Sequence, residues 1–181
     1  MSIDRLVETW KEVRGGLIDE VSQIPPEQFS FRATPDTRSV AELLQHVAET
    51  QKFLVGESCR PDPNLMRQSF QDHIKEYAPE CAAVQDKNGL LEMLRAGMET
   101  SEASIRASGE RMQDLMKRFD GKEISRLDFL QFALSHEMYH RGQLTVYERL
   151  MSIEPALTQR FRKLLARAEA NQTAQNAGGA V

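Results

Sequence analysis

Two histidines spaced four residues apart are the side chains of this sequence with the clearest chemical potential. On a helix, His136 and His140 would place their imidazoles on one face, one turn apart. That spacing lets one nitrogen from each ring reach a single divalent ion at about 2.0–2.1 Å. A third ligand must come from another segment, and His46 is the natural candidate, because it flanks the apolar face of a second expected helix. Three neutral histidines would leave at least one coordination position open, as catalytic sites do.

Histidines on apolar faces also occur as ordinary core residues with satisfied hydrogen bonds. Burying three imidazoles close together is costly, however, unless they share a partner. The pattern alone therefore leaves both interpretations open, a common metal ion and packing. The fourth histidine, His73, lies in an irregular stretch, and we interpret it as a surface or packing residue.

Residues 136–140 read His-Glu-Met-Tyr-His, which also matches the HExxH pattern of zinc proteases, with Glu137 as the general base. The extended form of that pattern would need Gly at position 143 and His at position 146. This sequence has Gln143 and Val146 there. An HExxH-type metalloprotease is therefore only a secondary alternative.

Four stretches with helical spacing of apolar residues would position the histidines. We expect helices over residues 2–21, residues 40–55, a range from Asp86 or Asn88 to about Gly109, and a range that opens at Ser125. Residues 56–86 are less regular, with a short helix expected within 66–77, and residues 109–124 are expected to be either irregular or a short extra helix. Without an alternating strand pattern of useful length, this order predicts an all-α four-helix bundle.

The helix that opens at Ser125 carries its expected inner face on every third or fourth residue. That face comprises Phe129, Phe132, Ala133, His136, His140, Gln143, Leu144, Tyr147 and Met151. A weaker stripe of Leu127, Leu130, Leu134 and Met138 could meet another helix or a second subunit. The inner stripe of the second helix is Leu43, Val47, Thr50 and Leu54, with His46 and Phe53 on its flank.

The C-terminal part is expected to differ from the bundle. Pro155 suits the first turn of a short extra helix, and residues 171–181 lack apolar periodicity. We therefore predict one domain over residues 1–170, followed by a disordered tail over 171–181.

Composition limits the classes of partner. The 181 residues carry a net charge of −4 and no block of Lys and Arg, so nucleic acid and anionic membranes are poor candidates. No stretch approaches the roughly 20 apolar residues of a membrane span, and the N-terminus has no apolar signal region, so we expect a cytoplasmic protein. We interpret Cys59 and Cys81 as reduced thiols.

Residues 135–144, Ser-His-Glu-Met-Tyr-His-Arg-Gly-Gln-Leu, resemble the H-x-x-x-H-R-G-Q signature of the DinB-like (YfiT-like) metal-binding superfamily. Residues 37–46, Thr-Arg-Ser-Val-Ala-Glu-Leu-Leu-Gln-His, are similar to its second hallmark, a capped helix that carries the first histidine. The resemblance covers about residues 1–155. It implies a four-helix bundle, often a homodimer, in which His46, His136 and His140 bind zinc, nickel or iron.

The resemblance further implies an enzyme that acts on small molecules, either a hydrolase or a transferase that uses a low-molecular-weight thiol. The open coordination position could hold a water whose pKa falls towards about 7, or a thiol. Three more residues are candidates for catalysis: Gln143 to orient a ligand, Tyr147 to direct its hydroxyl into a cavity, and Glu49 as a proton acceptor or a partner of the ligands. Their structural alternatives are a packing hydrogen bond, a core residue and a solvated charge.

A non-catalytic metal-binding or stress-response module, whose bundle mediates dimerisation, is the main alternative function. A pocket lined by Phe53, Phe132 and Tyr147 would favour the enzyme. Arg141 should point away from the histidine face and pair with an acid on another helix.

Overall fold

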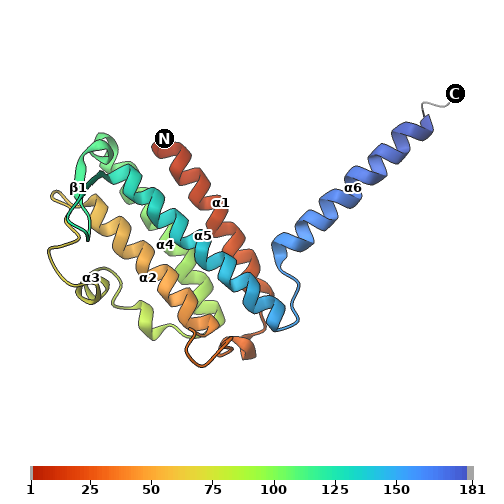
Figure 1. Cartoon of the computed structure of the whole chain (residues 1–181), viewed down its shortest axis with the longest axis horizontal. Helices are drawn as coiled ribbons and strands as arrows, with labels where there is room; N and C mark the ends of the chain where they lie inside the picture. Colours follow the sequence, from red (N-terminus) through yellow and green to blue (C-terminus); the bar gives the residue numbers. More distant parts are fainter. Residues whose placement is uncertain (1, 179–181) are drawn as a thin grey trace.

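Four long helices form the body of the protein in a computed structural model, which describes residues 2–178 and their side chains to residue 172 (Figure 1). They are α1 (Ile3–Gln23), α2 (Val40–Cys59), α4 (Lys87–Ser108) and α5 (Arg126–Leu150). The predicted four-helix bundle is confirmed. Within the described residues, no helix is long and apolar enough to cross a membrane.

Local capping chemistry sets where these helices begin. The side chains of Ser2, Ser39, Asp86 and Ser125 each accept a hydrogen bond from the backbone amide three residues later. At Ser39 this contact is part of a full capping box, because the Glu42 carboxylate accepts a hydrogen bond from the Ser39 backbone amide in return. Each cap satisfies an amide that the first helical turn leaves unpaired, so the predicted starts are correct.

The helices α1 and α2 occupy diagonal corners of the bundle, since each contacts α4 and α5. The helices α2 and α5 are antiparallel: Arg126, at the start of α5, donates to the carbonyls of Ser58 and Arg60 at the end of α2. The start of α2 therefore lies beside the later turns of α5, where His136 and His140 are found.

The long connections contain shorter elements. Between α2 and α4 lie the helix α3 (Phe70–Tyr77) and the 3-10 turn η2 (Cys81–Ala83), and the 3-10 turn η1 (Pro26–Gln28) precedes α2. The 109–124 region, for which we expected no strand, forms the 3-10 turn η3 (Gly109–Gln113) and an antiparallel hairpin of β1 (Leu115–Lys117) and β2 (Glu123–Ser125). Strands of three residues are too short to show an alternating pattern, so the sequence analysis missed them.

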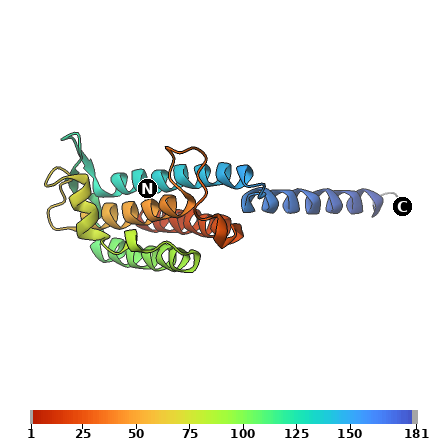
Figure 2. The ribbon, with the colours of Figure 1, turned by 90° about the horizontal axis from the view of Figure 1, so that it is seen from below.

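The C-terminal helix α6 (Ala156–Gly178) is longer than the short helix that we expected. It leaves the end of the bundle and projects away from it (Figure 2). It enters the segment from Asn171 onward for which we predicted disorder, and residues 179–181 lie outside the described residues. The Glu20 carboxylate accepts the first amides of α6, from Ala156 and Leu157, and so attaches α6 to α1.

A buried polar network joins all four bundle helices. Arg14 of α1 donates to both carboxylate oxygens of Glu137 on α5, at 2.5 and 2.8 Å. It also donates to Gln51 Oε1 on α2 at 2.7 Å and to the Leu94 carbonyl on α4 at 2.6 Å. Because each helix contributes one partner, the network favours a single register of the bundle.

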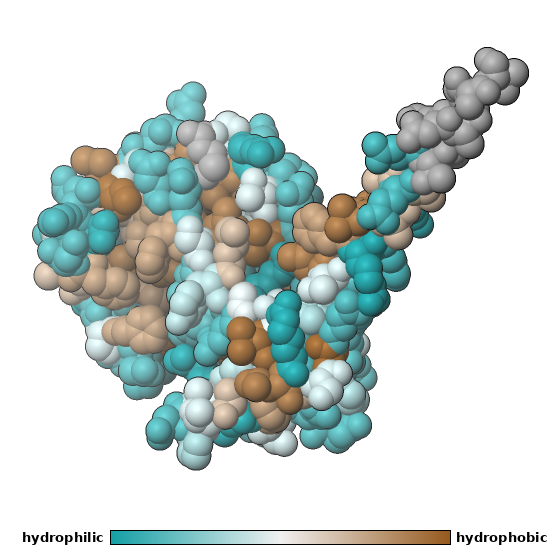
Figure 3. Space-filling view, turned by 45° about the vertical axis from the view of Figure 1, so that its right-hand side comes forward, coloured by the Kyte–Doolittle hydropathy of each residue, from teal (hydrophilic) through white to brown (hydrophobic). Residues whose placement is uncertain are grey.

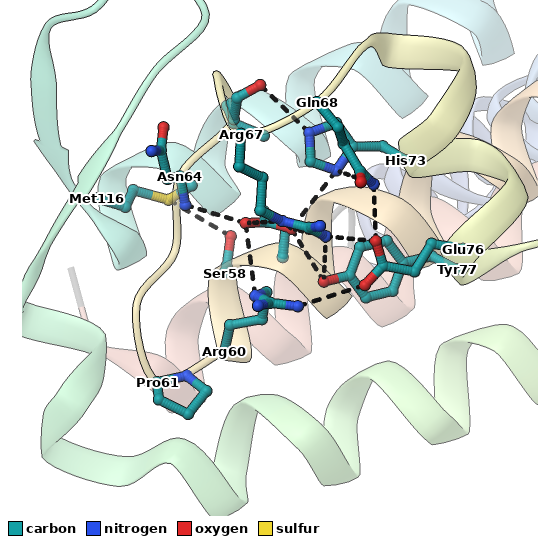
Figure 4. A network of polar contacts seen from close by, with 12 residues as sticks. Ser58, Arg60, Pro61, Asn64, Arg67, Gln68, His73, Glu76, Tyr77 and Met116 are labelled. Atoms are coloured by element: carbon teal, nitrogen blue, oxygen red, sulfur yellow. Dashed lines mark hydrogen bonds and ion pairs between the residues drawn. The ribbon is translucent and has the colours of Figure 1, made fainter.

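A second buried carboxylate, Glu57 near the end of α2, holds the 60–77 segment (Figure 4). It accepts from the Arg67 guanidinium at 2.8 Å, the Tyr77 hydroxyl at 2.9 Å and the Asn64 amide at 2.9 Å. His73 Nδ1 lies 3.5 Å away. His73 is fully buried, so it is a packing residue and not a surface one.

Candidate metal centre

Three imidazole nitrogens converge between the start of α2 and the later turns of α5. The Nε2 atom of His136 lies 3.2 Å from Nε2 of His46 and 3.1 Å from Nε2 of His140. Two ligands of a tetrahedral ion with bonds of about 2.0–2.1 Å are about 3.3 Å apart. The spacing of these nitrogens therefore matches that of ligands to a single small ion, and the three histidines could hold a metal.

Burial keeps these imidazoles neutral, the form that binds metals. Loss of solvent lowers the pKa of His46 to about 3 and that of His136 to about 4, and it lowers the pKa of His140. The nearby Arg38 guanidinium contributes to the lowering at all three. At neutral pH each ring thus has a free lone pair.

Neighbouring side chains orient two of the rings. The Nδ1 atom of His140 lies 3.0 Å from Gln143 Oε1, an acceptor, so Nδ1 carries the hydrogen and Nε2 carries the lone pair. The Thr50 hydroxyl lies 3.5 Å from Nδ1 of His46. Both contacts leave Nε2 facing the common centre. Converging lone pairs repel one another unless a cation lies between them, so this donor set fits a divalent ion.

Glu137 does not face the three histidines. Its carboxylate is 2% exposed, accepts from Trp10 Nε1 at 2.6 Å and pairs with Arg14. The secondary alternative, in which Glu137 is the general base of an HExxH protease, is therefore not supported by the structure. On a helix, position 137 points about 100° away from position 136, towards the bundle axis in this case.

Arg141 also points away from the centre, as we predicted. Its guanidinium donates to Glu20 Oε1 at 3.3 Å. It lies so close to Gly16 that a Cβ at that position would collide with it. Gly16 thus permits the close approach of α1 and α5 on this side.

The other predicted site residues lie in different surroundings. Gln143 touches His140, as above. Glu49 is half-buried, and burial raises the pKa of its carboxyl, opposed by Arg38. The Tyr147 ring is buried against Phe31, and its hydroxyl donates to the Arg38 carbonyl at 2.9 Å.

Phe53, Phe132 and Tyr147, whose shared pocket beside the centre would have favoured an enzyme, do not lie together. Phe132 is 56% exposed, and Phe53 stacks on His73, away from Tyr147. The buried arc of α5 is centred on Leu130, Glu137 and Leu144, because α1 and α2 both pack on it. Phe132 lies outside that arc. The second stripe of α5, which we expected to be the weaker one, lies inside it at Leu127, Leu130 and Leu134, whereas its fourth member, Met138, is exposed.

Sequence reasoning missed two residues near the centre. The spacing of four between His46 and Thr50 could have revealed the Thr50 contact. Arg38 lies in the loop before α2, for which periodicity gives no direction, so only the folded chain brings its charge to the histidines. Cys59 and Cys81 are free thiols, as expected.

The fold and the three histidines define the class of the protein: a helical bundle with a candidate three-histidine metal centre between two antiparallel helices. The model of the DinB family matches residues 1–172, and the chain belongs to that family.

Solved structures of low sequence identity share the fold. YfiT from Bacillus subtilis, described as a probable metal-dependent hydrolase with an unusual four-helix-bundle topology, is 17% identical, with a TM-score of 0.66 over 85% of this chain and 91% of its own. A DinB-like protein from Bacillus cereus is 12% identical, with a TM-score of 0.64 over 83% and 93%. The mycothiol-dependent maleylpyruvate isomerase is 10% identical, with a TM-score of 0.64 over 80% of this chain but only 61% of its own. No curated protein matches the sequence significantly.

Proposed function

We propose that this chain is a divalent-metal-dependent enzyme that acts on small molecules, with His46, His136 and His140 as the ligands. The observation that carries the proposal is the convergence of three Nε2 atoms with separations of 3.1 and 3.2 Å. Zinc, nickel and iron all accept imidazole nitrogen, so the donor set alone does not choose among them.

The residues around the centre have separate roles in this proposal. Gln143 and Thr50 hold His140 and His46 with their lone pairs directed inward, and Tyr147 holds the Arg38 backbone beside the centre. Glu49 lies one turn after His46 and is proposed to accept or deliver a proton; burial raises the pKa of its carboxyl, opposed by Arg38. A bound divalent ion would supply Lewis acidity and lower the pKa of a water or thiol in its open position.

Two reaction types fit this site. Hydrolysis is favoured by the likeness to YfiT, and transfer or isomerisation with a low-molecular-weight thiol is favoured by the likeness to the mycothiol-dependent isomerase. We propose hydrolysis as the first reaction to assay, because the isomerase is matched over only 61% of its length. In either case we propose a cytoplasmic enzyme with a small-molecule substrate, and not a nucleic-acid- or membrane-binding protein.

We further propose a homodimer in which a second copy covers the apolar face of α6. Figure 3 shows hydrophobic side chains near the base of α6. They include an apolar stripe whose members are 41–62% exposed: Leu157, Phe161, Leu164 and Leu165. Such a stripe stabilises a helix only when it is covered. Light scattering should give a dimer for the parent and a monomer for Phe161→Glu, and a monomeric parent would contradict the dimer.

Metal content tests the central proposal. The protein is purified without a tag or added metal, and mass spectrometry is applied to the parent, His46→Ala and the control His73→Gln. We expect about one ion per chain in the parent and control, and none in His46→Ala. Metal absent from the parent even after incubation with zinc, nickel or iron(II) would contradict the proposal. A metal-loaded parent that neither hydrolyses ester and amide panels nor conjugates thiols to electrophiles would favour the non-catalytic module.

A further inference from the structure

A small apolar pocket lies at the hairpin end of the bundle. It has a volume of about 170 Å³, and its lining residues are Arg118, Phe119, Asp120, Ile124, Phe129 and Phe132. An apolar cavity of about 150 Å³ in another protein holds one benzene molecule. This pocket therefore has room for one aromatic ring or a branched alkyl group of similar size.

The pocket lies on the same face of α5 as the candidate metal centre. Its lining residue Phe129 is seven residues before His136 on α5. Seven residues make nearly two turns, so Phe129 shares the face of His136 at an axial distance of about 10 Å, towards the hairpin end. On the antiparallel α2, the buried Phe53 is seven residues after His46 and packs behind the pocket residue Phe119.

The hairpin supplies the outer wall of the pocket. Phe119, in the turn between β1 and β2, has its ring centroid 6.1 Å from that of Phe53 and 6.5 Å from that of His73. His73 is itself fixed by its contact with the Leu65 carbonyl at 3.2 Å and by the Glu57 network (Figure 4). The wall is therefore anchored to α2 and α3, and the hairpin is not a free loop.

The chemistry of the lining favours an apolar occupant. Phe119 is 49% exposed and Phe132 is 56% exposed, and Phe132 stacks on the buried Phe129 with centroids 5.9 Å apart. Two exposed phenylalanines around one hollow are typical of a surface that a ligand covers. The charges at the rim, Arg118 and Asp120, pair with each other at 3.4 Å, so neither is left to bind an ion.

We infer that this pocket is a specificity subsite for the substrate of the candidate metal centre. The substrate would carry a polar, metal-binding group at one end and an aromatic or branched apolar group about 10 Å away. This inference rests on the proposed function, but the pocket itself can be tested without metal.

The first experiment measures ring binding alone, by ¹⁹F NMR line broadening of fluorobenzene. The parent, the metal-free His46→Ala and the control Met138→Ala, an exposed apolar residue elsewhere on α5, should all broaden the signal. Phe132→Ala should not, and because Phe132 is exposed, its removal leaves the core intact. Absence of broadening by the parent overturns the inference. If light scattering then shows that Phe132→Ala dissociates a dimer, a second copy of the chain covers the pocket instead.

The second experiment measures the coupling between pocket and metal, using calorimetry of two hydroxamates on the zinc-loaded protein. We expect 4-phenylbutanohydroxamate to bind the parent and Met138→Ala at least about tenfold more tightly than acetohydroxamate, from burial of the ring. Phe132→Ala should lose most of that gain and keep its affinity for acetohydroxamate. Equal affinities of the two probes for the parent overturn the inference. Failure of acetohydroxamate to bind contradicts the proposed function instead, and fluorobenzene still decides whether the pocket accepts a ring.

Discussion

The Oε1 atom of Gln143 lies 3.0 Å from Nδ1 of His140, and His140 is one helical turn before Gln143 on α5. This contact fixes which nitrogen of His140 carries the hydrogen and leaves Nε2 directed at His136. Partners of this kind typically change metal affinity by about 10- to 100-fold when removed.

Gln143→Ala is therefore expected to weaken metal binding by about tenfold or more, with little loss of stability, because Gln143 is only half-buried. Competition with a chromophoric chelator measures the affinity. Gln131→Ala, a glutamine of the same helix that contacts Asp128, is the matched control and should bind like the parent. Equal affinities in all three proteins would show that the contact does not orient His140.

Glu137→Gln tests whether Glu137 serves the bundle or the reaction. It leaves the buried Arg14 guanidinium without its charged partner, and breaking such a pair typically costs about 3–5 kcal/mol. Urea unfolding should show a loss of this order, while mass spectrometry shows that the metal content per folded chain is unchanged. The double variant Arg14→Met with Glu137→Leu should recover part of the loss. If Glu137→Gln instead kept the free energy of unfolding of the parent and lost all activity, Glu137 would be a catalytic group.

Glu148→Gln is expected to change how stability depends on pH. Burial raises the pKa of Glu148 to about 8, with a further contribution from the Glu20 carboxylate, opposed by Arg149 and Arg141. The folded state thus keeps a proton that the unfolded state releases near pH 4–5. This contribution to stability is complete below that pH and is lost as the pH rises to about 8.

Thermal unfolding of the parent should therefore move to lower temperature between pH 5 and pH 9, more steeply than that of Glu148→Gln. At pH 9 the variant should be more stable than the parent by about 1–3 kcal/mol, because the amide resembles the protonated acid. Glu92→Gln, which changes an exposed glutamate of α4, should follow the parent. Parallel curves for parent and Glu148→Gln would contradict the assignment.

Arg38→Gln should tighten metal binding by a few-fold. The Arg38 guanidinium acts on all three histidines and would repel a divalent cation at their centre. The gain should shrink in high salt, since Arg38 is exposed and its field is screened. Competition with a chelator at two salt concentrations measures the metal affinity, with Arg95→Gln as the control. Weaker binding in Arg38→Gln would mean that Arg38 instead positions the ligands.

The sequence by itself determined what depends on neighbours along the chain. Helix starts at Ser2, Ser39 and Ser125 follow from a side chain that caps an amide three residues away. The shared face of His136 and His140 follows from a spacing of four. His46 could be named as the third ligand from its place beside an apolar helix face and from the resemblance to a family. Its distance from His136 and His140 was decided by the fold, because no local rule relates two helices ninety residues apart in the sequence.

The predicted inner stripe of α2 is buried, but tertiary structure decided the exact direction of the buried face of α5. Periodicity placed Phe132 on the inner face of α5, and the HExxH match offered Glu137 as a protease base only as a secondary alternative. Packing of α1 and α2 on α5 instead places Glu137 in the core, where Arg14 and Trp10 satisfy it, and leaves Phe132 at the surface beside a pocket. The hairpin and the charge of Arg38 near the histidines depend likewise on contacts between distant segments. Local spacing predicts which residues share a face, but the direction of that face depends on which surfaces meet in the folded chain.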